Sequence, residues 1–172
     1  DKVLIPRPET EILVDEASKI LEKEDLEGKV LFDVCTGSGC IGLSLKKKFP
    51  DLSVYLSDVS SDALSVAEGN GLKNSLDVTF LKGDFLEPFK GEKADYVFCN
   101  PPYVTEAEYK ELDLSVRGFE PKLALVGGES GLVFYERLAR ELPFYINPGA
   151  KVFLEIGFTQ GAALKEIFSA PI

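Results

Sequence analysis

Short apolar runs alternate with amphipathic stretches along almost the whole chain, and this alternation is the feature that most limits the available folds. Short runs rich in β-branched and aromatic side chains predict buried strands, whereas apolar residues at a helical spacing predict helices. Such an order favours an α/β fold in which a doubly wound, mostly parallel sheet is flanked by helices. The predicted strands are Lys29–Cys35, Ser53–Ser57, Asp77–Leu81, Ala94–Cys99 and Lys151–Ile156.

Helical periodicity fills most of the remaining sequence. The predicted helices are Pro8–Glu24, Cys40–Phe49, one capped by Ser60 or Ser61, Gly131–Leu142 and Gln160–Phe168. The connection 104–129 is too long for a plain turn, so we expect it to carry function. A length of 172 residues suits one domain, and we expect residues 1–172 to form it.

Composition narrows the function classes. The chain has 29 acidic and 19 basic residues, which argues against direct binding of nucleic acid. No apolar run approaches the roughly 18 residues that span a bilayer, so we expect no membrane association. The three cysteines have no CxxC spacing and indicate reduced thiols in a cytoplasmic protein. We expect a monomer.

The sequence contains no histidine. This excludes Ser-His-Asp and Cys-His triads, histidine-ligated zinc and imidazole acid–base chemistry. We predict no metal site. Any reaction must therefore depend on positioning, carboxylates, amides, backbone groups or a bound cofactor.

A glycine-rich loop follows the first predicted strand, in the run Asp33-Val34-Cys35-Thr36-Gly37-Ser38-Gly39 and on to Gly42. Glycines there allow a tight turn and a close approach to a ligand, and Gly42 permits close packing of helix on strand. Asp58 ends the next strand, where a carboxylate can hold ribose hydroxyls. It can equally be a helix cap.

Three interpretations of this loop remain open: a nicotinamide dinucleotide site, an S-adenosylmethionine site, or a tight turn without a ligand. A carboxylate at Asp33 would repel a pyrophosphate but suits a cofactor that carries an ammonium and a sulfonium. After the third strand, Asp84 can accept a hydrogen bond from an adenine amino group and Phe85 can stack on the base, although Asp84 also fits a turn. These features favour S-adenosylmethionine.

The run Asn100-Pro101-Pro102-Tyr103 follows the fourth strand, at the sheet edge where open α/β folds bind ligands. Asn100 offers an amide acceptor and two donors, and the prolines stiffen the loop and leave the Pro101 carbonyl without a competing local N–H. Tyr103 offers a ring face. Together they predict a binding site for a planar, polar nitrogen group.

With these motifs in this order, the chain resembles the class I methyltransferases. Two further segments, Ile5-Pro6-Arg7-Pro8-Glu9-Thr10-Glu11 and Val116-Arg117-Gly118-Phe119-Glu120-Pro121, resemble the HemK/PrmC family of glutamine-N5 methyltransferases over essentially all 172 residues. The family fold is Rossmann-like. The resemblance implies methyl transfer from S-adenosylmethionine, with S-adenosylhomocysteine as product, to the glutamine of the Gly-Gly-Gln motif of peptide chain release factors.

The expected site residues follow from the motifs and the resemblance. The expected catalytic residues are Asn100, Pro101, Pro102 and Tyr103. The expected cofactor-binding residues are Asp33, Cys35, Thr36, Gly37, Ser38, Gly39, Asp58, Asp84, Phe85 and Asn100. The expected substrate-binding residues are Asn100 to Tyr103 together with Arg7, Glu9 and Thr10, of which Glu9 and Thr10 are also ordinary residues for a first helical turn.

Some features depart from the family or stay open. Family members carry an N-terminal helical docking domain and end in a β-hairpin, neither of which this sequence includes, so we expect it to be part of a longer protein. Gly118 leaves the placement of Arg117 open. Glu155 lies in an apolar strand, where we expect a structural role and a partner in Arg7 or Arg117. A nucleic-acid amino methyltransferase and a NAD-dependent oxidoreductase remain alternative functions.

Overall fold

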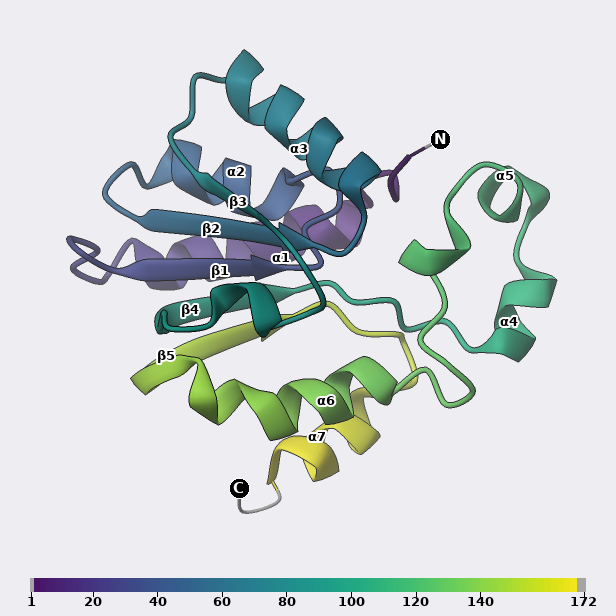
Figure 1. Ribbon diagram of the computed structural model, residues 1–172. Helices are drawn as coiled ribbons and strands as arrows, with labels where there is room; N and C mark the ends of the chain where they lie inside the picture. Colours follow the sequence, from purple (N-terminus) through teal and green to yellow (C-terminus); the bar gives the residue numbers. More distant parts are fainter. Residues whose placement is uncertain (1, 170–172) are drawn as a thin grey trace.

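Five parallel strands form one sheet in the order β3-β2-β1-β4-β5 in the computed structural model, which describes residues 2–169 (Figure 1). The doubly wound, parallel α/β fold predicted from the alternation is confirmed. The strands are β1 (Val30–Val34), β2 (Ser53–Asp58), β3 (Thr79–Lys82), β4 (Ala94–Cys99) and β5 (Ile146–Leu154).

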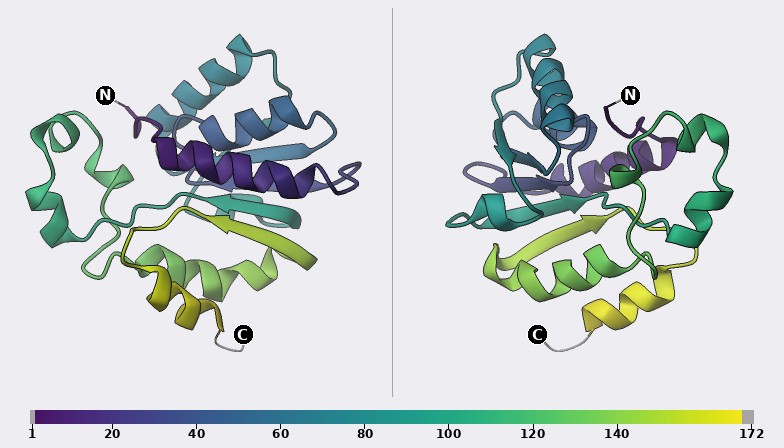
Figure 2. Two further views of the ribbon diagram at one scale, coloured as in Figure 1. Left: turned by 180° about the vertical axis from the view of Figure 1, so that it is seen from behind. Right: turned by 45° about the vertical axis from the view of Figure 1, so that its right-hand side comes forward.

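Helices cover both faces of the sheet, as Figure 2 shows. One face carries α1 (Pro8–Leu21), α2 (Cys40–Lys48) and α3 (Ser61–Lys73), and the other carries α6 (Val133–Glu141) and α7 (Gly161–Ser169). Successive strand residues point to opposite faces, so Leu31 packs in the core under α1 and α2 while Phe32 packs in the core under α6. Each face therefore has its own apolar core.

The last strand differs most from the prediction. Asn147-Pro148-Gly149 has the residues of a turn, yet β5 begins at Ile146, which pairs with Ala94. The pairing then shifts before Tyr96 meets Lys151, and this irregularity absorbs the proline and the glycine. The strand also ends at Leu154, so Glu155 lies just beyond it.

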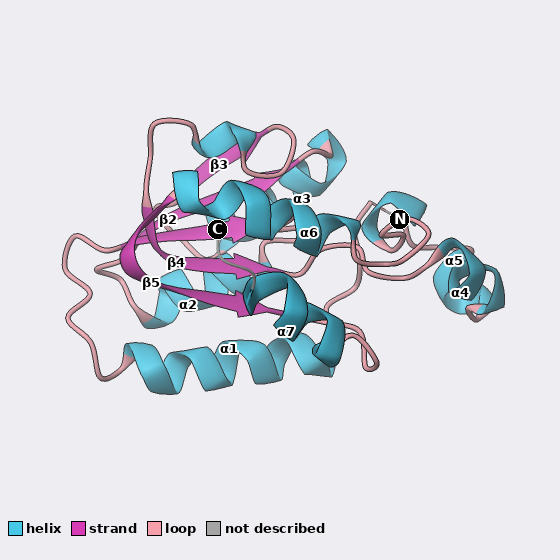
Figure 3. Ribbon diagram, turned by 90° about the horizontal axis from the view of Figure 1, so that it is seen from below, coloured by secondary structure: helices cyan, strands magenta, loops and turns pink. Residues whose placement is uncertain are grey.

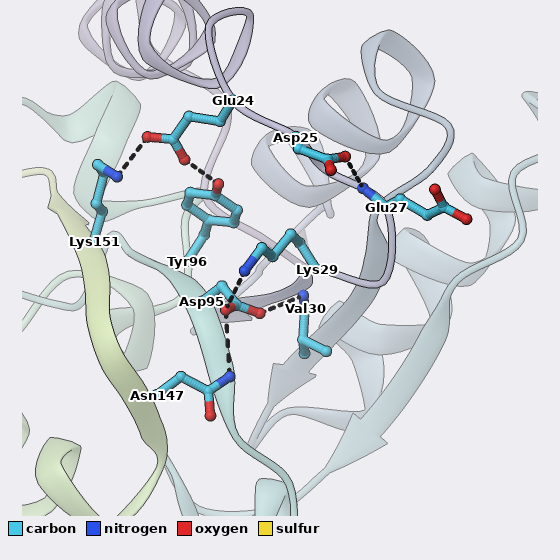
Figure 4. A network of polar contacts seen from close by, with 9 residues as sticks. All are labelled: Glu24, Asp25, Glu27, Lys29, Val30, Asp95, Tyr96, Asn147 and Lys151. Carbon is cyan, nitrogen blue, oxygen red and sulfur yellow. Dashed lines mark hydrogen bonds and ion pairs between the residues drawn. The ribbon is translucent and has the colours of Figure 1, made fainter.

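The two ends of the parallel strands carry different structures. We call the side of the sheet where the strands begin the amino edge, and the side where they end the carboxyl edge. At the amino edge, a polar network joins the carboxylates of Glu24 and Asp95 to nearby donors (Figure 4). At the carboxyl edge, the connection 104–129 projects beyond the sheet and contains α4 (Glu106–Glu111) and α5 (Leu114–Arg117), as Figure 3 shows. No helix within residues 2–169 is both long enough and apolar enough to cross a membrane.

Candidate active site

The glycine-rich loop joins β1 to α2 through a backbone that only a few residues can adopt. Gly37 and Gly39 have φ of 57° and 81°, in the left-handed region that glycine enters without strain. A side chain at Gly42 would place its Cβ 2.9 Å from Asp33 Oδ2, which confirms that a glycine is needed for the helix to pack this closely. The loop is thus built to bring backbone close to the carboxyl edge of the sheet.

Asp33 lies behind this loop rather than at its surface. It is fully buried, and its Oδ2 accepts hydrogen bonds from Thr36 Oγ1 at 2.6 Å and from the Gly42 N–H at 2.8 Å. Burial raises the pKa of Asp33 to about 6, against the lowering effect of these two bonds. Asp33 Oδ2 therefore fixes the loop from within, while Oδ1 accepts no hydrogen bond from the described residues.

Asp58 ends β2 beside the loop. Its Oδ2 accepts from the Gly37 N–H and its Oδ1 from the Ser60 N–H, both at 2.9 Å. Ser60 itself caps α3, because its hydroxyl accepts from the Ala63 N–H. Both carboxylate oxygens keep further lone pairs, so Asp58 can still accept hydrogen bonds from a ligand.

A pocket, here called the glycine-loop pocket, opens in front of the loop. Eight of the ten residues expected to bind the cofactor line it, namely Cys35, Thr36, Gly37, Ser38, Asp58, Asp84, Phe85 and Asn100, whereas Asp33 and Gly39 do not. Two carboxylates and one lysine, Lys2, are its charged lining residues. Such a lining suits a nucleoside with a cationic tail better than a pyrophosphate, so the residues present fit S-adenosylmethionine.

The far wall of this pocket is held by an ion pair that the sequence motifs did not reveal. Arg137 in α6 donates to both oxygens of Asp84 at 2.8 Å and lies 5.0 Å from the centre of the Phe85 ring. Phe134, one turn earlier, also lines the pocket and packs 5.7 Å from Phe85. Since α6 lies far along the chain, no local motif marks Phe134 or Arg137.

Backbone strain concentrates at the glycine-loop pocket. Among the described residues, three that are not glycine have positive φ, and two of them, Cys35 at 58° and Phe85 at 56°, line this pocket. Left-handed backbone costs free energy for a residue with a Cβ and persists where the surroundings hold it in place. The strain marks these two turns as positions fixed by tertiary packing.

Asn100 begins the second part of the site. Within the described residues, no group is hydrogen-bonded to its side-chain amide, and the carbonyl of Pro101 accepts no backbone hydrogen bond. The backbone that follows is tightly packed, because a Cβ at Gly127 would overlap the Pro102 carbonyl oxygen. The loop thus presents free acceptors on a fixed backbone.

Tyr103 lines a second pocket, here called the tyrosine pocket. Its carbonyl oxygen accepts from Gln160 Nε2 at 3.1 Å, and its hydroxyl is 3.5 Å from Glu155 Oε1. Burial, and then the charge of Glu155, raise the pKa of the phenol. The residues that line this pocket are Leu4, Arg7, Asn100, Pro101, Tyr103, Val104, Leu112, Val116, Ala124 and Leu125.

The long connection contributes residues to both pockets. Pro121 and Leu123 line the glycine-loop pocket, Leu112 and Val116 line the tyrosine pocket, and Ala124 lines both. The connection returns to its own start, where Val104 pairs with Val126. It therefore forms a wall around the Asn-Pro-Pro-Tyr loop.

The three N-terminal candidates are placed differently from one another. Thr10 is buried and lines the glycine-loop pocket, Arg7 lines the tyrosine pocket, and Glu9 is exposed and lines neither. Arg7 Nη2 is 2.5 Å from Oε1 of the buried Glu120, so its charge is already paired with the long connection. The structure brings Arg7 and Thr10 to the site but not Glu9.

The expected partner of Glu155 was wrong. Arg7 pairs with Glu120, and Arg117 Nη1 donates to the Lys110 carbonyl on the exterior of the long connection. Glu155 instead accepts from the Thr10 hydroxyl at 2.6 Å. These partners lie far apart in the sequence, so charge pairing alone could not identify them.

Comparisons with known proteins identify relatives of this chain. Release factor glutamine methyltransferase of Chlamydia trachomatis serovar D is 48% identical over 98% of this chain and 58% of that protein. The protein of the same name from Enterococcus faecalis is 41% identical over 99% of this chain and 60% of that protein. The chain thus spans about three fifths of the length of these relatives.

Solved structures and a family match complete the comparison. The fold is similar to the 16S rRNA methyltransferase RsmC of T. thermophilus in complex with AdoMet and guanosine, with a TM-score of 0.68, 19% identity, and coverage of 96% of this chain and 39% of that one. Residues 10–117 match the family described as Methyltransferase small domain, which favours methyl transfer over hydride transfer. The chain belongs to the methyltransferase small domain family.

Proposed function

We propose that the chain transfers a methyl group from S-adenosylmethionine to the side-chain amide nitrogen of the glutamine in the Gly-Gly-Gln motif of peptide chain release factors. The names of the relatives support this substrate, and the match extends over nearly all of this chain. The product would be S-adenosylhomocysteine. We also propose that the protein is cytoplasmic and acts as a monomer on a protein substrate.

The glycine-loop pocket is the proposed cofactor site. Asp58 would accept hydrogen bonds from the ribose hydroxyls, and Phe85 and Phe134 would enclose the adenine. Thr36 and Asp33 keep the loop in shape from behind. S-adenosylmethionine supplies a methyl group that is already activated by the positive charge of its sulfonium.

The tyrosine pocket is the proposed seat of the glutamine. A carboxamide nitrogen is a poor nucleophile, because its lone pair is delocalised into the carbonyl. Asn100 Oδ1 and the Pro101 carbonyl accept its two N–H hydrogens, which places the nitrogen and increases its electron density. The Asn100 amide donates to the substrate carbonyl, and Tyr103 packs against the side chain. Alignment supplies much of the rate. The nitrogen gains the methyl group as the bond from sulfur to the methyl carbon breaks, and it releases one proton to water after transfer, so no histidine base is needed.

One observation carries this assignment. Among the described residues, Asn100 is the polar side chain that lines both the glycine-loop pocket and the tyrosine pocket. A substrate amide bound there is next to both the pocket assigned to the methyl donor and the unpaired side-chain amide of Asn100. A nitrogen seated by Asn100 therefore lies beside the site that we assign to the methyl donor.

Transfer of labelled methyl from S-adenosylmethionine tests the proposal. Release factor with an intact Gly-Gly-Gln tip is compared with a Gly-Gly-Ala variant and with RNA. We expect label on the Gly-Gly-Gln protein alone. Label that survives the alanine change contradicts the glutamine assignment, and label on RNA alone favours a nucleic-acid amino methyltransferase.

A further inference from the structure

Glu155 occupies the point where β5 ends beside the Asn-Pro-Pro-Tyr loop. Its N–H donates to the Cys99 carbonyl at 3.1 Å, one peptide before Asn100, and its own carbonyl accepts from the Tyr135 hydroxyl at 2.8 Å. The residue is 8% exposed. Its backbone is therefore fixed on both sides, and its side chain is held inside the protein at the carboxyl edge.

The carboxylate of Glu155 is buried without a cation. Within residues 2–169 no lysine or arginine forms an ion pair with it, and hydroxyl groups are its side-chain partners. Oε2 accepts from Thr10 Oγ1 at 2.6 Å, and Oε1 faces the Tyr103 hydroxyl at 3.5 Å. An ionised carboxylate in such a place costs free energy that a neutral residue of the same shape would avoid.

Its two partners belong to different halves of the site. Thr10 lines the glycine-loop pocket, and Tyr103 lines the tyrosine pocket. Glu155 itself lines neither, so it touches neither proposed ligand. Hydrogen bonds to a charged acceptor are roughly twice as strong as neutral ones, and the 2.6 Å bond from Thr10 is of this kind. The 3.5 Å contact with the Tyr103 hydroxyl is longer than a normal O–H···O bond, so there the carboxylate acts mainly through its charge.

We infer that Glu155 is a positioning residue for methyl transfer: its buried carboxylate sets the placement of the tyrosine pocket against the glycine-loop pocket. The inference rests on the proposed function. Transfer between two bound groups is sensitive to small errors of placement, whereas binding of either group alone is not. Glu155 should therefore affect the rate of transfer rather than affinity or stability.

The variant Glu155→Gln removes the charge and keeps the shape. Its amide oxygen can still accept from Thr10, and its amide nitrogen can donate to the Tyr103 oxygen. We expect kcat to fall about tenfold, while the KM for release factor and the Kd for S-adenosylhomocysteine change less than about threefold. We expect the thermal unfolding midpoint to stay the same or rise, because a buried charge is lost.

Glu24→Gln is the matched control. Glu24 also accepts a hydrogen bond from a tyrosine hydroxyl, that of Tyr96, but at the amino edge and with Lys151 as a second donor. We expect this variant to be slightly less stable and to transfer methyl at the wild-type rate. Opposite responses of Glu155→Gln and Glu24→Gln separate positioning from a general effect of removing a carboxylate.

A double variant tests whether Glu155 acts through Tyr103. Tyr103→Phe removes the hydroxyl that faces Glu155, and the combination with Glu155→Gln should cost little more than the larger single effect. If the losses of rate in the two single variants multiply in the double variant, Glu155 does not act through Tyr103. Losses of stability, cofactor binding and transfer in proportion indicate a purely structural residue and overturn the inference.

Transfer assays distinguish failure of this inference from failure of the proposed function. Equal transfer by the wild type and by Glu155→Gln overturns this inference alone. No transfer by the wild-type chain to any Gly-Gly-Gln release factor overturns the proposed function and this inference together.

Discussion

At the amino edge of the sheet, Glu24 and Asp95 are partly exposed and bonded to lysines, whereas at the carboxyl edge Asp33 and Glu155 are buried and bonded to hydroxyl and amide groups. The pKa values of Asp33 and Glu24 follow this difference. Hydrogen bonds from Lys151 and Tyr96 lower the pKa of Glu24, whereas burial raises that of Asp33 to about 6.

The contrast indicates that the amino edge contributes to stability and the carboxyl edge to function. Charges at the amino edge are arranged in the way that stabilises a fold, with opposite charges in contact and water nearby. Buried carboxylates without cations lower stability, and they concentrate at sites where function requires them. We therefore expect changes at the amino edge to affect stability slightly, and changes at the carboxyl edge to affect methyl transfer strongly.

The largest expected effect comes from two asparagines on opposite edges. Asn100→Ala removes the proposed acceptor and should lower transfer by about 10²–10³-fold or more, while the Kd for S-adenosylhomocysteine stays within several-fold. Asn147→Ala removes an amide that lies 3.3 Å from Asp95 and should leave transfer unchanged. Transfer assays and calorimetry on both variants check this. Equal loss of binding and transfer in Asn100→Ala would mean that Asn100 acts mainly in cofactor binding.

The pH dependence of stability should have opposite signs at the two edges. Well below pH 3.8 the Asp33 carboxyl is protonated in both the folded and the unfolded chain. Between the ordinary pKa of 3.8 and the folded value of about 6, the unfolded chain ionises first, so the free energy of unfolding falls as pH rises. The total loss is about 3 kcal/mol.

Two variants in which an aspartate is replaced by asparagine measure this pH dependence. For Asp95, hydrogen bonds from Val30, Lys29 and Asn147 outweigh the effect of burial and lower the pKa, so its contribution is present above pH 3.8 and is lost as pH falls through the folded value. Urea unfolding of wild type, Asp33→Asn and Asp95→Asn between about pH 3 and 7 should show opposite trends relative to wild type. A difference between wild type and Asp33→Asn that is constant with pH contradicts the raised pKa.

A side chain added at Gly127 should displace the Asn-Pro-Pro-Tyr loop. The new Cβ would overlap the Pro102 carbonyl oxygen, so the Asn-Pro-Pro-Tyr loop must shift. We expect Gly127→Ala to lower transfer by about tenfold and the free energy of unfolding by about 1–3 kcal/mol. Gly69 lies in α3, where an added Cβ would have no neighbouring atom within 4 Å, and Gly69→Ala should raise stability by about 0.5–1 kcal/mol. Equal behaviour of the two variants in both assays would show that the contact with Pro102 does not matter.

The smallest effect should come from Lys151. Its amine is 2.5 Å from Glu24 Oε1, and its side chain is 43% exposed. Lys151→Ala should lower the free energy of unfolding by about 0.2–1 kcal/mol, less at high salt, with unchanged transfer. Unfolding at two salt concentrations checks this, and a large loss of transfer would show that the two edges are coupled.

Local sequence predicted those parts of the molecule that depend on local physics. The strand Ala94–Cys99 was predicted with its observed bounds, because a short, mostly apolar run ends at Asn100-Pro101-Pro102, where prolines stop pairing. The Ser60 cap and the tight turn at Gly37 follow in the same way from backbone chemistry. Each of these features is decided within a few residues.

Features that depend on tertiary packing could not be predicted. Thr10 and Glu155 are 145 residues apart, and Asp84 and Arg137 are 53 apart, so only the assembled sheet brings them together. The depth of Asp33 likewise depends on how α2 packs on β1. The sequence indicated which groups could meet a ligand, but not which of them are already engaged by another part of the protein.

The position of the added methyl group on the release factor distinguishes the proposed reaction from every alternative. Release factor incubated with this chain and S-adenosylmethionine is digested, and the peptide that contains Gly-Gly-Gln is sequenced by tandem mass spectrometry. We predict one added methyl group on the glutamine side chain with the wild-type chain, and none with Asn100→Ala. An unmodified glutamine with the wild-type chain, or a methyl group on another residue, would contradict the proposed function.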